Sequence, residues 1–407
     1  MALGQVRKQT NPDLGYEPLL AELITPVLSD CVQYKIPIIG NFGAANPPAA
    51  AKLIKNIARQ LGLRQIKIAV IEGDDITSSL DIENTPIWEG DSSIDIDKQK
   101  LISANVYLGA RSIADALLAG ADVVVAGRVA DPALVLGPVM AHYQWAWDDW
   151  DIIAQLTLAG HLLECGAQVT GGYFSDPGVK DVPNLARVGF PFAEINDDGS
   201  FVITKPIGTG GTVSAQTIKE QMLYEVHDPE SYITPDVILD ISQVELSVVG
   251  PDRILVQGAR GRPRPSQLKV TAGFVGDWLG EGEISYAGPN AVQRARLAAE
   301  IIKERLTIRA INVQTRFDLI GLSSAFDNQA GDLSKQYDTT CAPEVRLRMA
   351  ASSLKKDQVE KALQEVTSLY CTGPAGGGGV RTHIINRIHT LSYLVVREKV
   401  QSCYYFI

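Results

Sequence analysis

The chain has 407 residues, of which 45% are hydrophobic and 21% are charged, and this ordinary globular composition excludes a disordered or fibrous protein. Its 37 basic and 47 acidic residues give a formal net charge of −10, which argues against a nucleic-acid binder because such proteins need clustered Lys and Arg. The five cysteines are odd in number and lack a C-x-x-C spacing, which argues against a disulfide framework and a zinc knuckle. The sequence shows neither a secretory signal nor the run of about 20 apolar residues that a membrane helix requires. We therefore expect a cytoplasmic protein with no membrane or nucleic-acid partner.

Short apolar runs alternate with amphipathic helices in the first part of the chain, which is typical of βαβ units. Three nearly continuous apolar runs predict parallel strands covered on both faces, at residues 35–40, 66–71 and 122–126. Helices are predicted after Pro47-Pro48, over 104–118, after Asp131-Pro132 and over 149–168. We predict an α/β fold in which helices flank a largely parallel sheet.

The pattern changes after Gly171-Gly172. Residues 192–205 predict a β-hairpin that turns at Asp197-Asp198-Gly199, and residues 237–275 are rich in strand-forming sequence. Further helices are predicted at 213–224, 288–305 and 356–369, with a strand at 309–319. We therefore place a boundary near residue 175. It separates a Rossmann-like α/β lobe at 1–175 from a second α/β or α+β lobe at 176–407, rich in β-hairpins and glycine loops.

Candidate binding residues lie in the loops that follow the predicted parallel strands, because ligands of open parallel sheets bind beyond the carboxyl ends of the strands. Arg128 directly follows a buried strand and presents a fixed cation that suits a carboxylate or phosphate. Asn46 and Asp131 are either cleft residues or caps of the helices that follow them. The substrate-binding candidates in these loops are Asn41, Asn46, Asp75 and Arg128. We expect Arg128 to lie beside the 41–46 loop and to form one wall of a substrate cleft with it.

Glu72, Asp74 and Asp75 also follow a predicted strand and could hold a divalent cation or a ribose. Neither a histidine nor a Gly-x-Gly-x-x-Gly sequence accompanies them. A metal at these three carboxylates is therefore a minor alternative, and we predict no metal site.

The predicted helix at 149–168 carries His161, Glu164 and Cys165, whose i, i+3, i+4 spacing places them on one face. Such a trio can form a polarised thiol with a base and an orienting carboxylate. A buried cysteine beside a hydrogen-bonded core histidine would give the same sequence pattern. We name His161, Glu164, Cys165 and Asp131 as catalytic candidates and expect them to face the same cleft as Arg128.

Two glycine-rich loops are further candidates. Residues 208–212 precede a predicted helix, so their N–H groups could bind an anion, although the loop lacks the ending of a P-loop. Residues 373–379 are followed by Arg381, and we predict an ordered loop that lets a ligand approach the backbone, a mobile linker being the alternative. The substrate-binding candidates in or next to these loops are Gly210, Gly211, Gly376, Gly377 and Arg381. Thr170 and Gly171 are further substrate-binding candidates outside them.

Several phrases occur in an order that is typical of one family. They are Gly43-Ala44-Ala45-Asn46-Pro47, Gly73-Asp74-Asp75, Gly127-Arg128-Val129-Ala130-Asp131, His161-Leu162-Leu163-Glu164-Cys165-Gly166, Lys205-Pro206-Ile207-Gly208-Thr209-Gly210-Gly211 and Gly373-Pro374-Ala375-Gly376-Gly377-Gly378-Gly379. Over nearly its whole length the chain resembles the acyclic terpene utilisation A (AtuA-like) family. The resemblance implies bacterial breakdown of citronellol- and geraniol-type compounds as coenzyme A thioesters, and it assigns no catalytic residue.

The resemblance also implies differences at both ends. Family members usually carry a further strand and glycine-rich turn before the position that matches Gly15-Tyr16-Glu17-Pro18, and longer relatives carry an extra small C-terminal domain. If the glycine-rich turn contributes to the ligand site, we expect this chain to be a fragment or to lack activity.

We therefore expect a catabolic enzyme that acts on a branched acyl-CoA or related carboxylate as a lyase, hydratase or hydrolase without a redox cofactor. Its expected partners are a small-molecule substrate and further copies of itself in a homo-oligomer. A non-catalytic ligand-binding or scaffold subunit of a degradation complex is the first alternative. A divalent-metal lyase that uses Glu72, Asp74 and Asp75 is the second.

Overall fold

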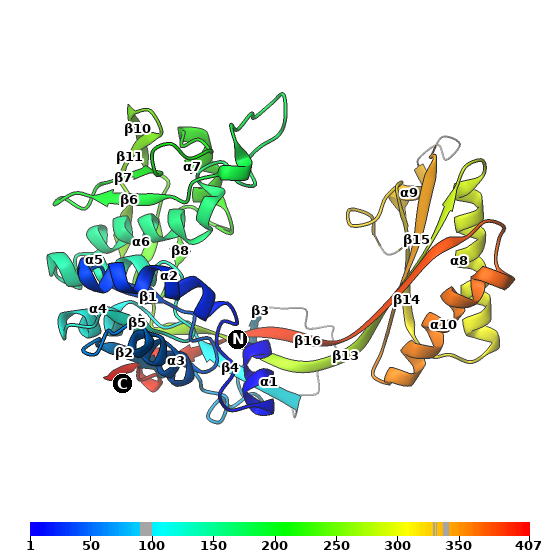
Figure 1. Cartoon of the computed structure of the whole chain (residues 1–407), viewed down its shortest axis with the longest axis horizontal. Helices are drawn as coiled ribbons and strands as arrows, with labels where there is room; N and C mark the ends of the chain where they lie inside the picture. The colour runs from blue at the N-terminus through cyan, green and yellow to red at the C-terminus, as the bar shows by residue number, and fades with distance from the viewer. Residues whose placement is uncertain (90–99, 329, 331, 337–341) are drawn as a thin grey trace. The chain divides into compact units, whose positions relative to one another are not determined.

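The computed structural model describes residues 1–407 except 90–99, 329, 331 and 337–341. The chain forms two compact units. Within the described residues, the first unit contains 1–89, 101–273 and 390–407, and the second contains 100 and 274–389 (Figure 1). The boundary expected near residue 175 lies inside the first unit, because the hairpins that follow it pack together with the N-terminal elements.

The first unit is built on a four-stranded sheet. Its strands run in the order β1 (Ile38–Gly40), β5 (Val123–Val125), β2 (Ile68–Glu72) and β17 (Cys403–Phe406). The three strands predicted from apolar runs are parallel neighbours, since both Ile38 and Ile68 pair with Val123. The side chains of β5 are fully buried, as expected of a central strand covered on both faces. The antiparallel edge strand β17 was not predicted.

Helices flank this sheet. They are α2 (Leu20–Gln33), α3 (Pro47–Gln60) and α4 (Arg111–Leu118), while α5 (Ala133–Tyr143) packs on α4, α6 (Trp150–Glu164) packs on α5, and the short α1 (Ala2–Thr10) lies against β4 (Leu101–Val106). One core cluster joins the apolar faces of α2 and α3 to the sheet through residues such as Leu28, Ile54 and Val70. The helix predicted at 104–118 is wrong in its first part. Residues 101–106 form a strand because they pair with β13 (Gln267–Ala287), a partner distant in sequence.

Two smaller antiparallel sheets complete the first unit. One has the order β10 (Glu245–Gly250), β11 (Arg253–Gln257), β7 (Phe201–Thr204) and β6 (Phe192–Ile195). The other contains β12 (Arg260–Arg262), β9 (Ile238–Asp240) and β8 (Tyr232–Ile233). The predicted 192–205 hairpin is confirmed as β6 and β7, and Gly199 provides the positive φ of 82° in its turn. The helix α7 (Ala215–Leu223) begins with a capping box formed by Ser214 and Thr217.

The second unit has the element order β13, α8 (Ala291–Ile308), β14 (Gln314–Ile320), β15 (Glu344–Ser353), α10 (Lys356–Thr372) and β16 (Gly378–Val396). The sheet order β14-β15-β13-β16 with this β-α-β-β-α-β connectivity is the ferredoxin-like arrangement. Both long helices contact β15 and each other, and they lie side by side in Figure 1. Their core includes Ile284, Met349 and Val366. The remaining elements are α9 (Asp332–Gln336) and β3 (Ile87–Glu89), which pairs with the end of β16 in the first unit.

In the described part of the chain, we find no helix with the length and apolar character needed to cross a bilayer.

Asp236 connects the small β8–β9 sheet to α4. Both of its carboxylate oxygens accept a hydrogen bond from the backbone N–H of Ala110, at 3.1 and 3.0 Å, and so supply the cap that α4 lacks in its own sequence. The approach is close, because a Cβ at Gly109 would lie 2.3 Å from Asp236 Oδ1. Burial raises the pKa of Asp236 to about 6.

The raised pKa of Asp236 makes the stability of the protein depend on pH. Between about pH 4 and pH 6 the folded state keeps a proton that the unfolded state releases, so the contribution of this group to the free energy of unfolding falls as pH rises. Asp236→Asn keeps an acceptor oxygen and removes the charge. Relative to this variant, we expect the wild type to lose roughly 2–3 kcal/mol between pH 4 and pH 7, measured by urea denaturation.

Asp240→Asn is the matched control. Hydrogen bonds from Ser242 lower the pKa of the Asp240 carboxyl. The stability of the wild type relative to Asp240→Asn should therefore not fall between pH 4 and pH 7. Parallel pH profiles for the wild type and Asp236→Asn would contradict the assignment.

Candidate active site

The loops after β1 and β5 meet at the carboxyl edge of the parallel sheet. Asn41 Nδ2 donates to Asp131 Oδ1 at 3.2 Å, and the same oxygen forms an ion pair with the Arg128 guanidinium. The prediction that Arg128 lies beside the 41–46 loop is therefore confirmed. The guanidinium also lies 4.7 Å from the centre of the Tyr107 ring. That these residues form the wall of a substrate cleft stays a prediction.

A buried carboxylate fixes the backbone beneath this edge. Asp74 Oδ2 accepts hydrogen bonds from the backbone N–H of Arg128 and from Asn105 Nδ2, both at 2.9 Å. A Cβ at Gly127 would lie only 2.7 Å from Asp74 Oδ1, so the turn passes directly over the carboxylate. Burial raises the pKa of Asp74. This residue therefore positions Arg128 and does not itself face a ligand.

The carboxylates considered as a metal site have separate partners. Asp75 accepts from the backbone N–H and hydroxyl of Thr77, and Glu72 accepts from the Tyr405 hydroxyl at 3.3 Å. Among the residues that the structure describes, no group of three His, Cys, Asp or Glu side chains is arranged to hold a metal ion. The geometry thus gives the minor metal hypothesis no support.

His161 and Glu164 form a buried pair at the end of α6. His161 is 1% exposed, and its Nδ1 lies 3.1 Å from Glu164 Oε1, as the i, i+3 spacing predicts. Asp149 caps the start of this helix. The helix ends at Glu164, before the predicted residue 168, because Gly166 adopts a positive φ of 56°. Two atoms of the pair, His161 Nε2 and Glu164 Oε2, are buried and have no hydrogen-bond partner within the described chain.

The end of α6 lies close to the Arg128 edge. Burial raises the pKa of Glu164, and the charges of Asp131 and Glu225 raise it further, while the bond from His161 lowers it. The Asp131 carboxylate also contributes to the raised pKa values of Cys165 and Tyr232. Asp131 therefore interacts electrostatically with both Arg128 and the His161–Glu164 pair.

Three residues near the pair were not predicted from the sequence. The Tyr232 ring packs edge-on against His161 with a centroid distance of 5.3 Å. Gln221 Nε2 donates to the backbone oxygen of His161 at 3.1 Å, and Gln221 Oε1 is buried without a partner among the described residues. Glu225 contributes its charge. No candidate site motif identified in the sequence contains Gln221, Glu225 or Tyr232.

Cys165 lies in surroundings that disfavour a thiolate. Burial raises the pKa of its thiol, and the charges of Glu164, Glu225 and Asp131 act in the same direction. A hydrogen bond with Gln221 lowers the pKa of the Cys165 thiol and only partly offsets these effects, and His161 Nδ1 is paired with Glu164. The structure therefore favours the interpretation of Cys165 as a small packing residue.

The raised pKa of Cys165 predicts slow alkylation. At pH 7, iodoacetamide should modify Cys165 at least about tenfold more slowly than the exposed Cys371 and Cys403, measured by mass spectrometry of peptides. Cys31 is a second, half-buried reference thiol, whereas Cys341 lies outside the described residues. Faster labelling of Cys165 than of Cys371 would restore it as a nucleophile.

In the loop at 208–212, the backbone N–H groups of residues 209–212 are engaged within the protein. The backbone N–H groups of Gly210, Gly211 and Thr212 donate to the carbonyls of Arg187, Pro183 and Thr170. A Cβ at Gly211 would lie 2.5 Å from the Thr170 oxygen, which explains the glycine. The predicted anion cradle is wrong here, because these donors hold neighbouring loops together.

Three other binding candidates have structural partners. Thr170 donates its hydroxyl to the Gly189 carbonyl at 2.6 Å, and Gly171 adopts a positive φ of 105° beside Val182. Asn46 Nδ2 donates to the carbonyls of Pro12 and Leu14 and so anchors the N-terminal segment. Neither Asn46 nor Asp131 caps a helix through its side chain.

The loop at 373–379 belongs to the second unit. Arg294 holds it by donating from Nη1 to the Ala375 carbonyl at 2.7 Å, and Gly376 adopts a positive φ of 73° at that contact. A Cβ at Gly377 would lie 2.8 Å from Ile284 and 3.1 Å from the ring of Tyr286. The glycine therefore makes room for the core of the unit, and a role of Gly377 in ligand approach stays a prediction. Arg381 is exposed.

This packing changes the expected effect of Gly377→Val. Because the new side chain would collide with Ile284 and Tyr286, we expect the variant to lose about 1–3 kcal/mol of stability, measured by thermal denaturation. Gly378→Val is the control, since a Cβ at Gly378 meets no atom within 4 Å and the variant should unfold within a few degrees of the wild type. Equal melting temperatures for both variants would show that Gly377 is not constrained by packing.

Comparisons with known proteins give one match over essentially the whole chain. The model of a family described as "Acyclic terpene utilisation family protein AtuA" matches residues 1–406. No curated protein matches the chain. Among solved structures, a hydantoinase/carbamoylase family amidase from Burkholderia ambifaria matches at 13% identity over 31% of this chain and 29% of that chain. Its TM-score of 0.18 carries no conclusion about fold or activity.

Proposed function

The chain belongs to the acyclic terpene utilisation family AtuA, and from that premise we propose that it is a catabolic enzyme acting on a branched acyl-CoA or related carboxylate. We propose acid–base chemistry of the lyase, hydratase or hydrolase type, carried out at the His161–Glu164 pair. The family name supports the substrate class, and the side chains of the first unit support the chemistry.

The main support for this proposal is that His161 Nε2 is buried and has no hydrogen-bond partner among the described residues. A buried polar atom without a hydrogen bond costs free energy, so such atoms are uncommon in folded proteins. His161 Nε2 is such an atom, and it is explained if it bonds to a bound ligand or takes part in catalysis. With a proton on Nδ1, His161 donates to Glu164 Oε1, and the lone pair on Nε2 is then free to accept a proton. A carboxylate that orients a histidine in this way is a recurrent arrangement in acid–base catalysis.

The neighbouring residues have separate roles in this proposal. Arg128 would hold the carboxylate or thioester oxygen of the substrate, since its guanidinium is the cation at this edge and is partly exposed at 18%. Asp131 and Asn41 would orient Arg128. Asp131 also disfavours ionisation of Glu164, so the pair can retain a proton at a higher pH than an isolated carboxyl. Cys165 has no chemical role.

His161→Gln tests the proposal. Gln cannot take up a proton, so we expect kcat to fall by about 10²–10⁴-fold on branched acyl-CoA thioesters, assayed by thiol release and by change in thioester absorbance. Binding of the same thioesters, measured by calorimetry, should change by less than about threefold because Nε2 acts on the reacting atoms.

His142→Gln is the matched control. His142 lies on α5, where its ring contacts Tyr143, and the variant should retain wild-type turnover. Full turnover by His161→Gln would remove this pair from the mechanism. Thioester binding with no turnover by the wild-type protein at any pH between 5 and 9 would instead support the non-catalytic binding subunit.

A further inference from the structure

The second unit carries a cavity of its own. It has a volume of about 710 Å³ and is lined by β13, β14, β15, β16 and the loop that follows β14. Its charged lining residues are Arg316, Arg348, Arg387, Asp318 and Glu283. The volume falls in the range of about 300–1,000 Å³ that is typical of small-molecule sites. All of these residues belong to the second unit, and none is part of the His161–Glu164 site.

The strand register explains the depression on this face of the sheet. Arg316 on β14 and Glu281 on β13 both pair with Ala350 on the intervening strand β15. Alternate residues of a strand point to opposite faces, so Ala350 lies between two long charged side chains on one face. The helices occupy the other face, where α10 packs against Gly280 and Gly282. A small side chain among large ones leaves a depression with charged walls.

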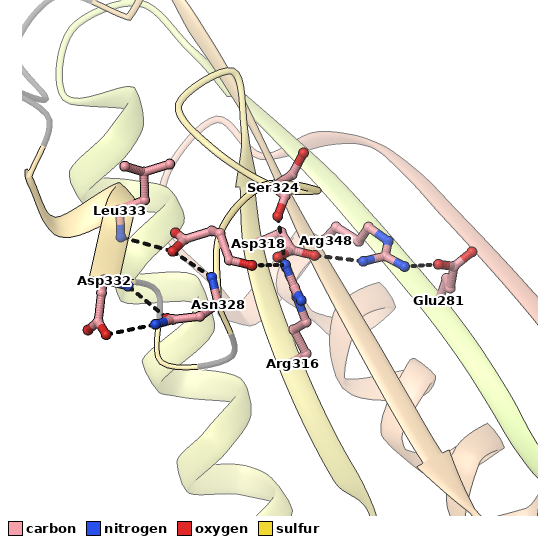
Figure 2. A network of polar contacts seen from close by, with 9 residues as sticks. Glu281, Arg316, Asp318, Ser324, Asn328, Asp332, Leu333 and Arg348 are labelled. Carbon is pink, nitrogen blue, oxygen red and sulfur yellow. Dashed lines mark hydrogen bonds and ion pairs between the residues drawn. The ribbon is translucent and has the colours of Figure 1, made fainter. Parts of the chain in front are cut away.

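Buried ion pairs fix two of the three arginines. Asp318, whose side chain is 4% exposed, accepts from Arg316 Nε at 2.8 Å and from Arg348 Nη1 at 2.6 Å, as Figure 2 shows. Arg348 also pairs with Glu281. Arg316 Nη2 donates to the carbonyls of Ser324 and Asp327 in the loop after β14. These bonds hold both guanidinium planes in place.

The third arginine, Arg387, is held by an ion pair with Asp277. Arg387 on β16 donates from Nε and Nη2 to the two oxygens of Asp277, at 2.8 and 2.5 Å. Asp277 also lies 3.2 Å from His389 Nε2. This bidentate pair directs the remaining nitrogen of Arg387 away from its partner carboxylate.

Each of the three guanidiniums retains donors. Within the described residues no protein group accepts from Arg316 Nη1, Arg348 Nε or Arg387 Nη1. The oxygens of Asp318 are already engaged by two of these arginines. Pre-organised guanidiniums with free N–H groups bind carboxylate and phosphate oxygens, because their planar geometry matches two acceptor oxygens.

We propose that this cavity is a binding site for a small-molecule anion that presents carboxylate or phosphate oxygens to Arg316, Arg348 and Arg387. The anion would replace water at the free donors while the ion pairs with Asp318, Glu281 and Asp277 stay intact. Ala350 provides the space that it occupies.

Isothermal titration calorimetry on the full chain at low ionic strength tests this site. Inorganic pyrophosphate and succinate are the probes, and the one that binds more tightly identifies phosphate or carboxylate as the preferred group. We expect Arg387→Gln to weaken binding by about tenfold or more, because it removes one fixed cation from the lining. Arg253→Gln is the matched control: Arg253 forms a bidentate ion pair with Glu194, neither residue lines the cavity, and its loss should change affinity by less than about threefold.

Ala350→Leu provides a test that leaves every charge in place. The larger side chain fills the depression, so binding should be lost while the melting temperature stays near that of the wild type. Three results would overturn the proposal: no binding of either probe to the wild type at millimolar concentration, unchanged binding by Ala350→Leu, or equal weakening by Arg253→Gln and Arg387→Gln.

Discussion

The buried carboxylate of Asp74 is the interaction on which the candidate active site depends. It accepts from the backbone of Arg128 and from Asn105, and without these two donors a carboxylate at this depth would be costly. Because one donor is the backbone of the turn after β5, the bond sets where that turn leaves the sheet. The position of the Arg128 backbone, from which its side chain reaches Asp131, follows from this constraint.

Local sequence patterns were sufficient to predict part of the structure. The apolar runs of β1, β2 and β5 gave the parallel sheet, because a strand covered on both faces has a distinctive composition. Helical spacing gave the His161–Glu164 contact, and the common edge of parallel strands gave the meeting of Arg128 with Asn41. These features depend on periodicity or on a general property of sheets, so they can be read without knowing the tertiary contacts.

The features that the sequence did not reveal depend on partners far along the chain. The strand β4 exists because of β13, and the edge strand β17 because of β2. Gln221 and Tyr232 reach His161 only through the packing of α7 and β8 on α6. The glycines of the loops at 208–212 and 373–379 suggested ligands, but the atoms that a Cβ would meet at Gly210, Gly211 and Gly377 are backbone and core atoms of the protein itself. The sequence shows where glycine occurs and does not show which atoms, if any, approach it.

The edge strand β17 has a consequence for synthesis on the ribosome. The first unit contains residues from both sides of the second, so the second unit is an insertion in the order of translation. The second unit can fold as soon as β16 has emerged, whereas β2 must wait for residues 403–406 before its outer edge is covered. Until then the nascent chain exposes an apolar strand with unpaired backbone groups, which is the form of intermediate that chaperones protect from mispairing.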